Sequence, residues 1–306
     1  MKNKVTIIGA GMVGSTLAYS LVTQDSAEEI AIVDLNKKLA KAQVMDLQHA
    51  VPFTKQTHVK VGTYNDCRDS GVVVITCGAA QKPGETRLDL IEKNTKIIRE
   101  IMPQIFKANP NIVVLMITNP VDVLTYAAIK MFPKKKHQIM GSGTTLDTAR
   151  FRYLLSQKLN INAKSIHAYI MGEHGDSEFP VWSTARIGNS KLLEHKNFNK
   201  QDQVKVFKET KNAAYAIIDG KQSTYYGIGS AASYIIKAIL HDKRIILPVS
   251  HLIENIYGVK DVCLSTPAIV GGKGVMETLP LELSKEEQKL FKNSAKVLKK
   301  AIKSVS

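Results

Sequence analysis

The chain has 306 residues, with 42 lysines plus arginines against 27 aspartates plus glutamates, which gives a formal charge of +15 with the eight histidines counted neutral. An apolar fraction of 44% and a charged fraction of 23% are ordinary for a globular protein, and they exclude a disordered, collagen-like or disulfide-scaffold chain. Cys67, Cys77 and Cys263 show neither close pairing nor metal-ligand spacing, so we expect free thiols, no metal site and a reducing, cytoplasmic compartment.

The basic surplus consists mostly of lysine, because only seven of the basic residues are arginine. The lysines are scattered, and their densest groups, at residues 134–136 and 299–303, read as a loop and the solvated face of a terminal helix. A nucleic-acid binder would be expected to gather arginines and aromatic residues along one element. We therefore expect solubility and weak attraction to polyanions, with no nucleic-acid partner.

The amino terminus imitates a secretory signal, since Lys2 and Lys4 precede a largely apolar stretch at residues 5–22. That stretch also contains Gly9, Gly11 and Gly14, a fixed spacing that a signal peptide does not need. No apolar run elsewhere approaches the roughly 18–20 residues of a membrane span. We expect neither export nor a membrane partner.

The first 140 residues alternate short β-rich runs with helical patterns. The runs at residues 72–75 and 112–117 are apolar without alternation, which is typical of central parallel strands covered on both faces. This rhythm predicts a doubly wound parallel sheet of the Rossmann kind, an α/β fold. The expected strands lie at residues 5–8, 30–33, 59–61, 72–76, 112–117 and 138–140.

The rhythm changes after residue 141, where we expect a mixed α+β substrate domain. The last helix begins at Ser284, which forms a capping box with Glu287. We place the domain boundary so that residues 1–141 bind the dinucleotide and residues 142–306 bind the substrate. The expected elements are a helix at 146–159, a glycine-containing hairpin at 166–175, helices at 201–219 and 225–241, further strands, and the terminal helix.

A glycine-rich turn follows the first strand and opens the first helix. Gly9 allows the tight turn, Gly11 lets backbone approach a pyrophosphate, and Gly14 allows close helix packing. Met12 and Val13 would lie at the helix amino terminus, where an anion is favoured. Asp34 ends the next strand, 20 residues after Gly14, where its carboxylate can accept both ribose hydroxyls and repel a 2′-phosphate. The pattern predicts NAD as the cofactor, in preference to NADP.

His174 lies between two glycines in a predicted turn. A histidine in a turn is usually a surface residue, but reduction of a ketone needs a proton donor that titrates near neutral pH. Asp147 and Arg150 share one face of a predicted helix, so that Asp147 can orient a histidine while Arg150 clamps a carboxylate. The alternative is an ordinary salt bridge at the start of a helix.

These motifs occur in an order and spacing that resemble the lactate/malate dehydrogenase family, and within it the bacterial L-lactate dehydrogenases. The resemblance spans essentially the whole chain. It is carried by the glycine turn with Asp34, by residues 81–87 (QKPGETR), 118–120 (TNP) and 147–150 (DTAR), and by residues 172–175 (GEHG).

The resemblance implies the roles of the catalytic residues. His174 would exchange the proton with the carbonyl oxygen, and Asp147 would stabilise its charged form. Arg150 would bind the substrate carboxylate, and Arg87, on a closing loop, would polarise the carbonyl.

Three further residues would line the site. Asn119 would lie near the nicotinamide and the substrate carbonyl, Thr224 would line the substrate pocket, and Ile228 would contact the nicotinamide ring. Without the family, Asn119 and Thr224 read only as a turn former and a helix start.

Gln81 decides the expected substrate. A malate dehydrogenase typically has arginine there, because the second carboxylate of oxaloacetate must be paired in a dry pocket. A neutral glutamine suits pyruvate, so we expect reversible conversion of pyruvate and L-lactate. Malate/oxaloacetate remains the alternative, and a branched 2-oxo acid is also compatible.

Arg152 lies about 200° round the helix from Arg150, so the two cannot serve one ligand. By resemblance, Arg152 and His167 form an anion site for fructose 1,6-bisphosphate at a subunit interface, in an allosteric homotetramer. The alternative is a surface arginine and a strand histidine without a ligand.

A noncatalytic dinucleotide-binding or polyanion-binding protein would not need His174, Asp147, Arg150 and Arg87 together. Their joint presence favours an enzyme over this class.

Overall fold

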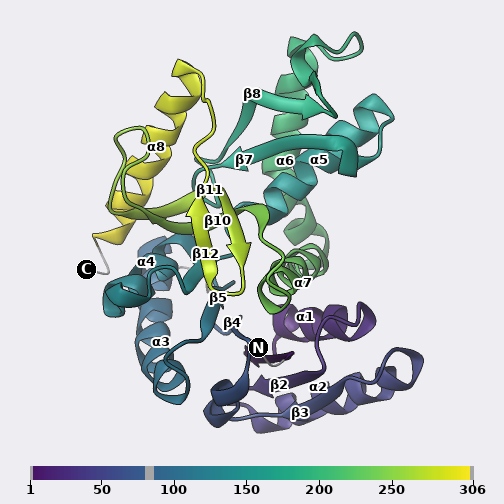
Figure 1. The fold of residues 1–306 in the computed structure, drawn as a ribbon, viewed down its shortest axis with the longest axis vertical. Helices are drawn as coiled ribbons and strands as arrows, with labels where there is room; N and C mark the ends of the chain where they lie inside the picture. Colours follow the sequence, from purple (N-terminus) through teal and green to yellow (C-terminus); the bar gives the residue numbers. More distant parts are fainter. Residues whose placement is uncertain (1–2, 80–85, 304–306) are drawn as a thin grey trace.

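The computed structural model describes residues 3–79 and 86–303. The first half contains six parallel strands with helices between them (Figure 1), and each expected strand is confirmed to within one or two residues. The strands are β1 (Lys4–Ile8), β2 (Glu29–Val33), β3 (His58–Val61), β4 (Val72–Ile75), β5 (Val113–Met116) and β6 (Ile139–Gly141), and the helices are α1 (Met12–Thr23), α2 (Lys37–Ala50), α3 (Arg87–Ala108) and α4 (Val121–Met131).

The second half begins with α5 (Thr145–Leu159) and ends with α8 (Lys285–Ile302), whose capping box between Ser284 and Glu287 is present. Between them lie β7 (Ile166–Met171), β8 (Phe179–Ile187), β9 (Ser190–Lys191), α6 (Lys200–Lys221), α7 (Tyr226–Leu240), β10 (Ile245–Ile253), β11 (Val262–Gly271) and β12 (Gly274–Thr278). Short 3₁₀ turns occur at η1 (Val51–Phe53), η2 (Tyr64–Asp69), η3 (Pro133–Lys135), η4 (Ala163–Ser165) and η5 (Leu192–Glu194).

The hairpin expected at residues 166–175 is wrong in its extent. Those residues form β7 and part of the following turn, and the returning strand is β8, which pairs with β7 from Met171 opposite Phe179 to Ile166 opposite Ile187. The turn is longer than expected, and Glu173 and Ser177 bridge it. The Glu173 carboxylate accepts hydrogen bonds from the Ser177 hydroxyl at 2.6 Å and from the Ser177 backbone N–H at 3.3 Å.

One nine-stranded sheet, in the order β12-β11-β10-β6-β5-β4-β1-β2-β3, runs through both halves. The carboxy-terminal strands join it antiparallel, through the pairing of Ser250 in β10 with Gly141 in β6. The strands β7, β8 and β9 form a separate sheet. The fold class expected from the sequence, a Rossmann-like parallel sheet followed by a mixed α/β part, is confirmed.

Helices cover the large sheet on both faces, as Figure 1 shows for α3 and α4 on one side and α1 on the other. Side chains from α3, α4 and α8 fill the core on one face, and those from α1, α2 and α7 fill the other. A third cluster lies between α5, α6 and the small sheet. Within the part of the chain that the structure describes, no helix is both long and apolar enough to cross a membrane.

The close contact between α1 and α7 joins the glycine turn to the second half. A Cβ atom at Gly229 would lie 2.9 Å from the Thr16 methyl carbon, so the two helices pack nearly backbone to backbone. This contact brings the start of α7, with Ile228, to the helix that follows the glycine turn. The residues expected to hold the cofactor therefore come from both halves of the chain.

Candidate active site

The glycine turn after β1 has the geometry that a dinucleotide pyrophosphate requires. Gly9 has a φ of +116°, and a Cβ atom there would lie 2.6 Å from the Cys77 backbone nitrogen. A Cβ atom at Gly14 would lie 1.9 Å from the Gly9 carbonyl oxygen, whereas one at Gly11 would meet nothing within 4 Å. Gly9 and Gly14 thus fix the turn, and Gly11 leaves open space above it.

The start of α1 presents backbone donors to this space. Gly11 is its N-cap, with no side-chain capping bond, and the first turn contains no acidic residue. The first N–H groups of the helix are therefore available to an anion, which the helix dipole also favours. Met12 is exposed and Val13 is half-buried at this helix end.

Asp34 lies beside the turn, held by two backbone donors. Its Oδ2 accepts a hydrogen bond from Ala10 N at 2.7 Å, and its Oδ1 accepts one from Asn36 N at 2.7 Å. Each carboxylate oxygen keeps a lone pair for a further donor, such as a ribose hydroxyl. The turn, the helix end and Asp34 together fit NAD.

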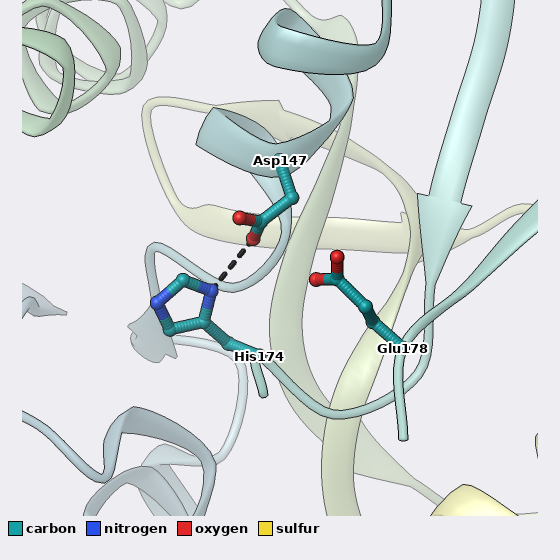
Figure 2. Close-up of side chains that lie close together, drawn as sticks. All are labelled: Asp147, His174 and Glu178. Carbon is teal, nitrogen blue, oxygen red and sulfur yellow. Dashed lines mark hydrogen bonds and ion pairs between the residues drawn. The ribbon is translucent and has the colours of Figure 1, made fainter. Parts of the chain in front are cut away.

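The second half brings His174, Asp147 and Arg150 into one hydrogen-bonded group (Figure 2 shows His174 with Asp147). The imidazole Nδ1 lies 2.6 Å from Asp147 Oδ2, and an Arg150 guanidinium nitrogen donates to Asp147 Oδ1 at 2.8 Å. Asp147 is buried, while the His174 side chain is 26% exposed. The Nε2 atom, on the other side of the ring, remains available to a substrate.

The charges of this group keep His174 protonated. Burial by itself lowers the pKa of His174, but the Asp147 carboxylate, with smaller effects of Asp122 and Glu178, raises it by more, to about 9. Burial raises the pKa of Asp147, and the His174 charge and hydrogen bond overcome this, so that its pKa lies below the usual value. The pair is therefore an ionised carboxylate and an imidazolium at neutral pH, which is the form that donates a proton.

The loop that carries His174 is fixed by its backbone. Gly172 has a φ of +97°, and a Cβ atom there would lie 2.7 Å from Ser294 Oγ of α8. The same hydroxyl accepts from Glu173 N at 2.7 Å. The His174 N–H donates to Asp122 Oδ2 of α4 at 2.8 Å. The histidine is thus held by α4, α5 and α8.

Sequence reasoning missed three buried polar residues around the site: Asn94, Asp122 and Glu178. Asn94 donates to the Asn119 carbonyl oxygen at 2.8 Å and accepts from Ala79 N at 2.7 Å, which ties the segments after β4 and β5 together. Its position in the apolar stripe of α3, between Ile91 and Ile98, is a signal that could have identified it.

The remaining predicted site residues lie near the ends of helices or outside the described part. Gln81 falls outside the described residues. Arg87 is the first residue of α3, after the Thr86 cap. Asn119 is exposed just before α4, and its Oδ1 accepts from Val121 N at 3.3 Å. Thr224 and Ile228 are half-buried, just before α7 and in its first turn.

Arg152 points to a different surface from Arg150. Its Nε donates to the Ala168 carbonyl oxygen of β7 at 2.9 Å, and its guanidinium lies 4.9 Å from the centre of the Tyr169 ring. His167 is exposed on β7 and pairs with Arg186 of β8. Three basic residues therefore gather along the small sheet.

Comparison with known proteins agrees with this geometry. Residues 3–141 match the family model described as lactate/malate dehydrogenase, NAD binding domain, and residues 144–306 match lactate/malate dehydrogenase, alpha/beta C-terminal domain. The first description confirms NAD as the cofactor.

Curated relatives and solved structures match over nearly the whole chain. L-lactate dehydrogenase 1 of Bacillus cereus is 48% identical and L-lactate dehydrogenase 2 of Bacillus anthracis 47% identical, each alignment covering 98% of this chain and 97% of the relative. The crystal structure of minor L-lactate dehydrogenase from Enterococcus mundtii in the ligands-bound form has a TM-score of 0.97 at 37% identity, covering 100% of this chain and 99% of the other. The structure of MGS-M5, a lactate dehydrogenase from a Medee basin deep-sea metagenome library, has a TM-score of 0.96 at 39% identity, covering 99% of each chain. This chain belongs to the lactate/malate dehydrogenase family.

Proposed function

We propose that this protein is an L-lactate dehydrogenase, which interconverts pyruvate and L-lactate with NAD as the cofactor. The observation that carries the proposal is that the buried Asp147 carboxylate binds both His174 and Arg150. It thereby holds a proton donor and a group that can bind a carboxylate next to each other. The names of the relatives, all L-lactate dehydrogenases, support the same substrate.

His174 is the proposed acid and base. Because the ionised Asp147 can only accept, it holds the proton on Nδ1 and leaves Nε2 to face the substrate oxygen. In pyruvate reduction Nε2–H gives its proton to the carbonyl oxygen, and Asp147 then holds the neutral ring in place. In lactate oxidation the neutral Nε2 accepts the hydroxyl proton, and Asp147 stabilises the imidazolium that forms.

Arg150 is the proposed clamp for the substrate carboxylate. One guanidinium nitrogen is fixed by Asp147, and the remaining N–H donors are free to bind a carboxylate in the bidentate manner of arginine. Arg87 is proposed to polarise the substrate carbonyl, and Asn119, Thr224 and Gln81 to line the pocket.

NAD supplies and accepts the hydride when bound. We assign its pyrophosphate to the backbone of Gly9, Gly11, Met12, Val13 and Gly14, its ribose to Asp34, and its nicotinamide to the region of Asn119 and Ile228. Residues 1–141 would form the cofactor-binding domain and residues 142–306 the substrate-binding domain.

Pyruvate is favoured over oxaloacetate because Gln81 offers no positive charge to a second carboxylate. An unpaired carboxylate in a dry pocket costs several kcal/mol, on the order of a thousand-fold in affinity. The malate reading gains no support from the relatives compared above.

We further propose that the enzyme is a homotetramer activated by fructose 1,6-bisphosphate through Arg152 and His167. Arg186 beside His167 adds to the positive charge that a bisphosphate needs. Large apolar side chains exposed on three neighbouring helices support self-association; they are Tyr19, Met45, Tyr226 and Tyr234. The free thiols of the three cysteines fit a reducing, cytoplasmic compartment, in which we propose that the enzyme serves glycolysis and fermentation.

Replacing His174 by alanine tests the proposal. The wild-type protein should oxidise NADH in the presence of pyruvate, and His174→Ala should lose roughly 10²–10⁴-fold in kcat/KM because the proton donor is gone. NADH fluorescence should still report binding to the variant, since the glycine turn and Asp34 are untouched. Turnover by the variant close to wild type would contradict the assigned role.

A further inference from the structure

A second buried carboxyl group, unused by the mechanism above, lies beside the catalytic pair. Glu178 immediately precedes β8 and is 7% exposed. One oxygen of Glu178, one oxygen of Asp147 and a ring nitrogen of His174 all lie within 4.8 Å of one another. Figure 2 shows the Glu178 carboxyl facing the pair.

The two carboxyl groups cannot both carry a charge at low cost. Asp147 is fixed as a carboxylate, because it accepts hydrogen bonds from both His174 and Arg150. Among the described residues, no hydrogen bond holds the Glu178 carboxyl. Two negative charges about 5 Å apart in a site shielded from water repel strongly, so the proton resides on the carboxyl without donors.

The other charges around Glu178 do not reverse this outcome. Arg150 on α5 and Lys211 on α6 favour its ionisation, but Arg150 is bound to Asp147. The Lys211 ammonium donates to the Asp176 carbonyl oxygen at 2.6 Å and lies 3.8 Å from the Asp176 carboxylate. On α8, Glu287 accepts from Trp182 N and Ser183 N, further along β8. Burial and the Asp147 charge raise the pKa of Glu178 to about 8, against the opposing charges of His174, Arg150 and Lys211.

We propose that Glu178 is a positioning residue that controls the charge of the substrate site, and that the enzyme binds and reduces pyruvate only while Glu178 is neutral. With Glu178 neutral, His174, Arg150 and Asp147 leave one net positive charge, which matches the single negative charge of a 2-oxo acid. Arg87 and the Asp122 carboxylate beside the His174 backbone carry opposite charges, so they leave this balance unchanged. With Glu178 ionised, that charge is cancelled, and the imidazolium holds its proton more tightly. This inference rests on the proposed function of the site.

The consequence is a requirement for two protons. The productive enzyme carries one proton on His174 and one on Glu178, so kcat/KM for pyruvate falls with the loss of either. Above the pH at which both groups titrate, kcat/KM should fall by about 100-fold per pH unit, against about 10-fold for a site with one titrating group.

Glu178→Gln, which is isosteric and permanently neutral, tests this requirement. Its matched control is Glu209→Gln, the same chemical change at an exposed position of α6. Each pH profile is normalised to its own plateau near neutral pH, so that only the shape is compared. The wild type and Glu209→Gln should show the two-proton fall, Glu178→Gln should show a one-proton fall, and Glu178→Asp, which retains a carboxyl, should restore the steeper fall. Parallel profiles for wild type and Glu178→Gln would overturn the proposal.

Infrared spectroscopy of protein labelled with ¹³C-glutamate tests the inference without turnover. The wild type should show the band of a neutral glutamic acid at pH 7, lost as the pH rises through about 8 and absent from Glu178→Gln. A wild-type protein without this band at pH 7 would overturn the proposal even if Glu178→Gln failed to fold. A wild-type protein that shows the band but does not reduce pyruvate would refute the proposed function while leaving the neutral Glu178 established.

Discussion

The backbone N–H of His174 donates to the buried Asp122 carboxylate at 2.8 Å, which couples the loop of this proposed catalytic histidine to the first turn of α4. Asn119, the residue assigned to the nicotinamide, lies just before the same helix. Burial raises the pKa of Asp122 to about 6, against the lowering effects of the Ser250 hydroxyl and the His174 N–H. A buried carboxyl group that accepts the backbone N–H of His174 points to a positioning role.

Replacing Asp122 by alanine should therefore impair catalysis through the position of His174. The buried N–H would lose its acceptor, at a cost of about 1–3 kcal/mol in stability. We expect kcat/KM to fall roughly tenfold or more. Asp122→Asn keeps an amide oxygen that can accept the same bond, so it should retain more activity than Asp122→Ala. Steady-state kinetics and thermal unfolding of both variants check this, and equal activity of the two would argue against the positioning role.

Replacing Asp147 by asparagine should move the pH dependence of the reaction. Without the carboxylate, the largest influence that raises the pKa of His174 is gone and burial opposes only the weaker effects of Asp122 and Glu178, so this pKa should fall well below about 9. Pyruvate reduction at pH 7 should then fall by roughly 10²–10⁴-fold and recover in part as the pH is lowered. An unchanged pH profile would show that Asp147 does not set the charge of His174.

The same pair predicts how folding stability varies with pH. Because the pKa of His174 is higher in the folded protein than the ordinary value of 6.5, the pair stabilises the fold fully below about pH 6.5, and this contribution is lost as the pH rises through about 9. The unfolding free energy of the wild type should fall across this range more than that of Asp147→Asn. Parallel denaturation curves for the two proteins across this range would contradict the prediction.

Alanine substitutions at two glycines of the cofactor turn should affect stability and NADH binding differently. In Gly14→Ala the new Cβ would meet the Gly9 carbonyl oxygen, so we expect a loss of about 1–3 kcal/mol in stability together with weaker NADH binding. In Gly11→Ala the Cβ meets no atom of the protein, so the unfolding temperature should stay close to wild type while NADH binding weakens. Unchanged NADH affinity in Gly11→Ala would place the pyrophosphate elsewhere.

Arg152→Gln tests the proposed effector site. The variant should lose activation by fructose 1,6-bisphosphate while keeping its turnover at saturating pyruvate, since Arg152 is directed to β7 and not to Asp147. Kinetics with and without the bisphosphate, together with sedimentation velocity for the homotetramer, check this. Activation that survives the substitution would remove Arg152 from the effector site.

The local part of the fold could be predicted from the sequence, and the long-range pairings could not. Valine- and isoleucine-rich runs marked the parallel strands because a strand buried on both faces needs apolar residues throughout. The local sequence around Ser250 does not predict its pairing with Gly141, since that contact joins segments over a hundred residues apart.

The residues of the site also fall into those that the sequence predicts and those that it does not. Motifs identified His174, Asp147 and Arg150, because their residue types and spacing match one chemistry. Asp122 and Glu178 belong to none of the motifs read from the sequence, and only the structure shows that both are buried beside His174.

The most direct test of the central claim is the ratio of kcat/KM for pyruvate to that for oxaloacetate, measured on the wild-type protein by NADH oxidation with chiral analysis of the product. We predict a ratio well above one, with L-lactate as the product. A preference for oxaloacetate, or no turnover with either acid, would contradict the assignment of this protein as an L-lactate dehydrogenase.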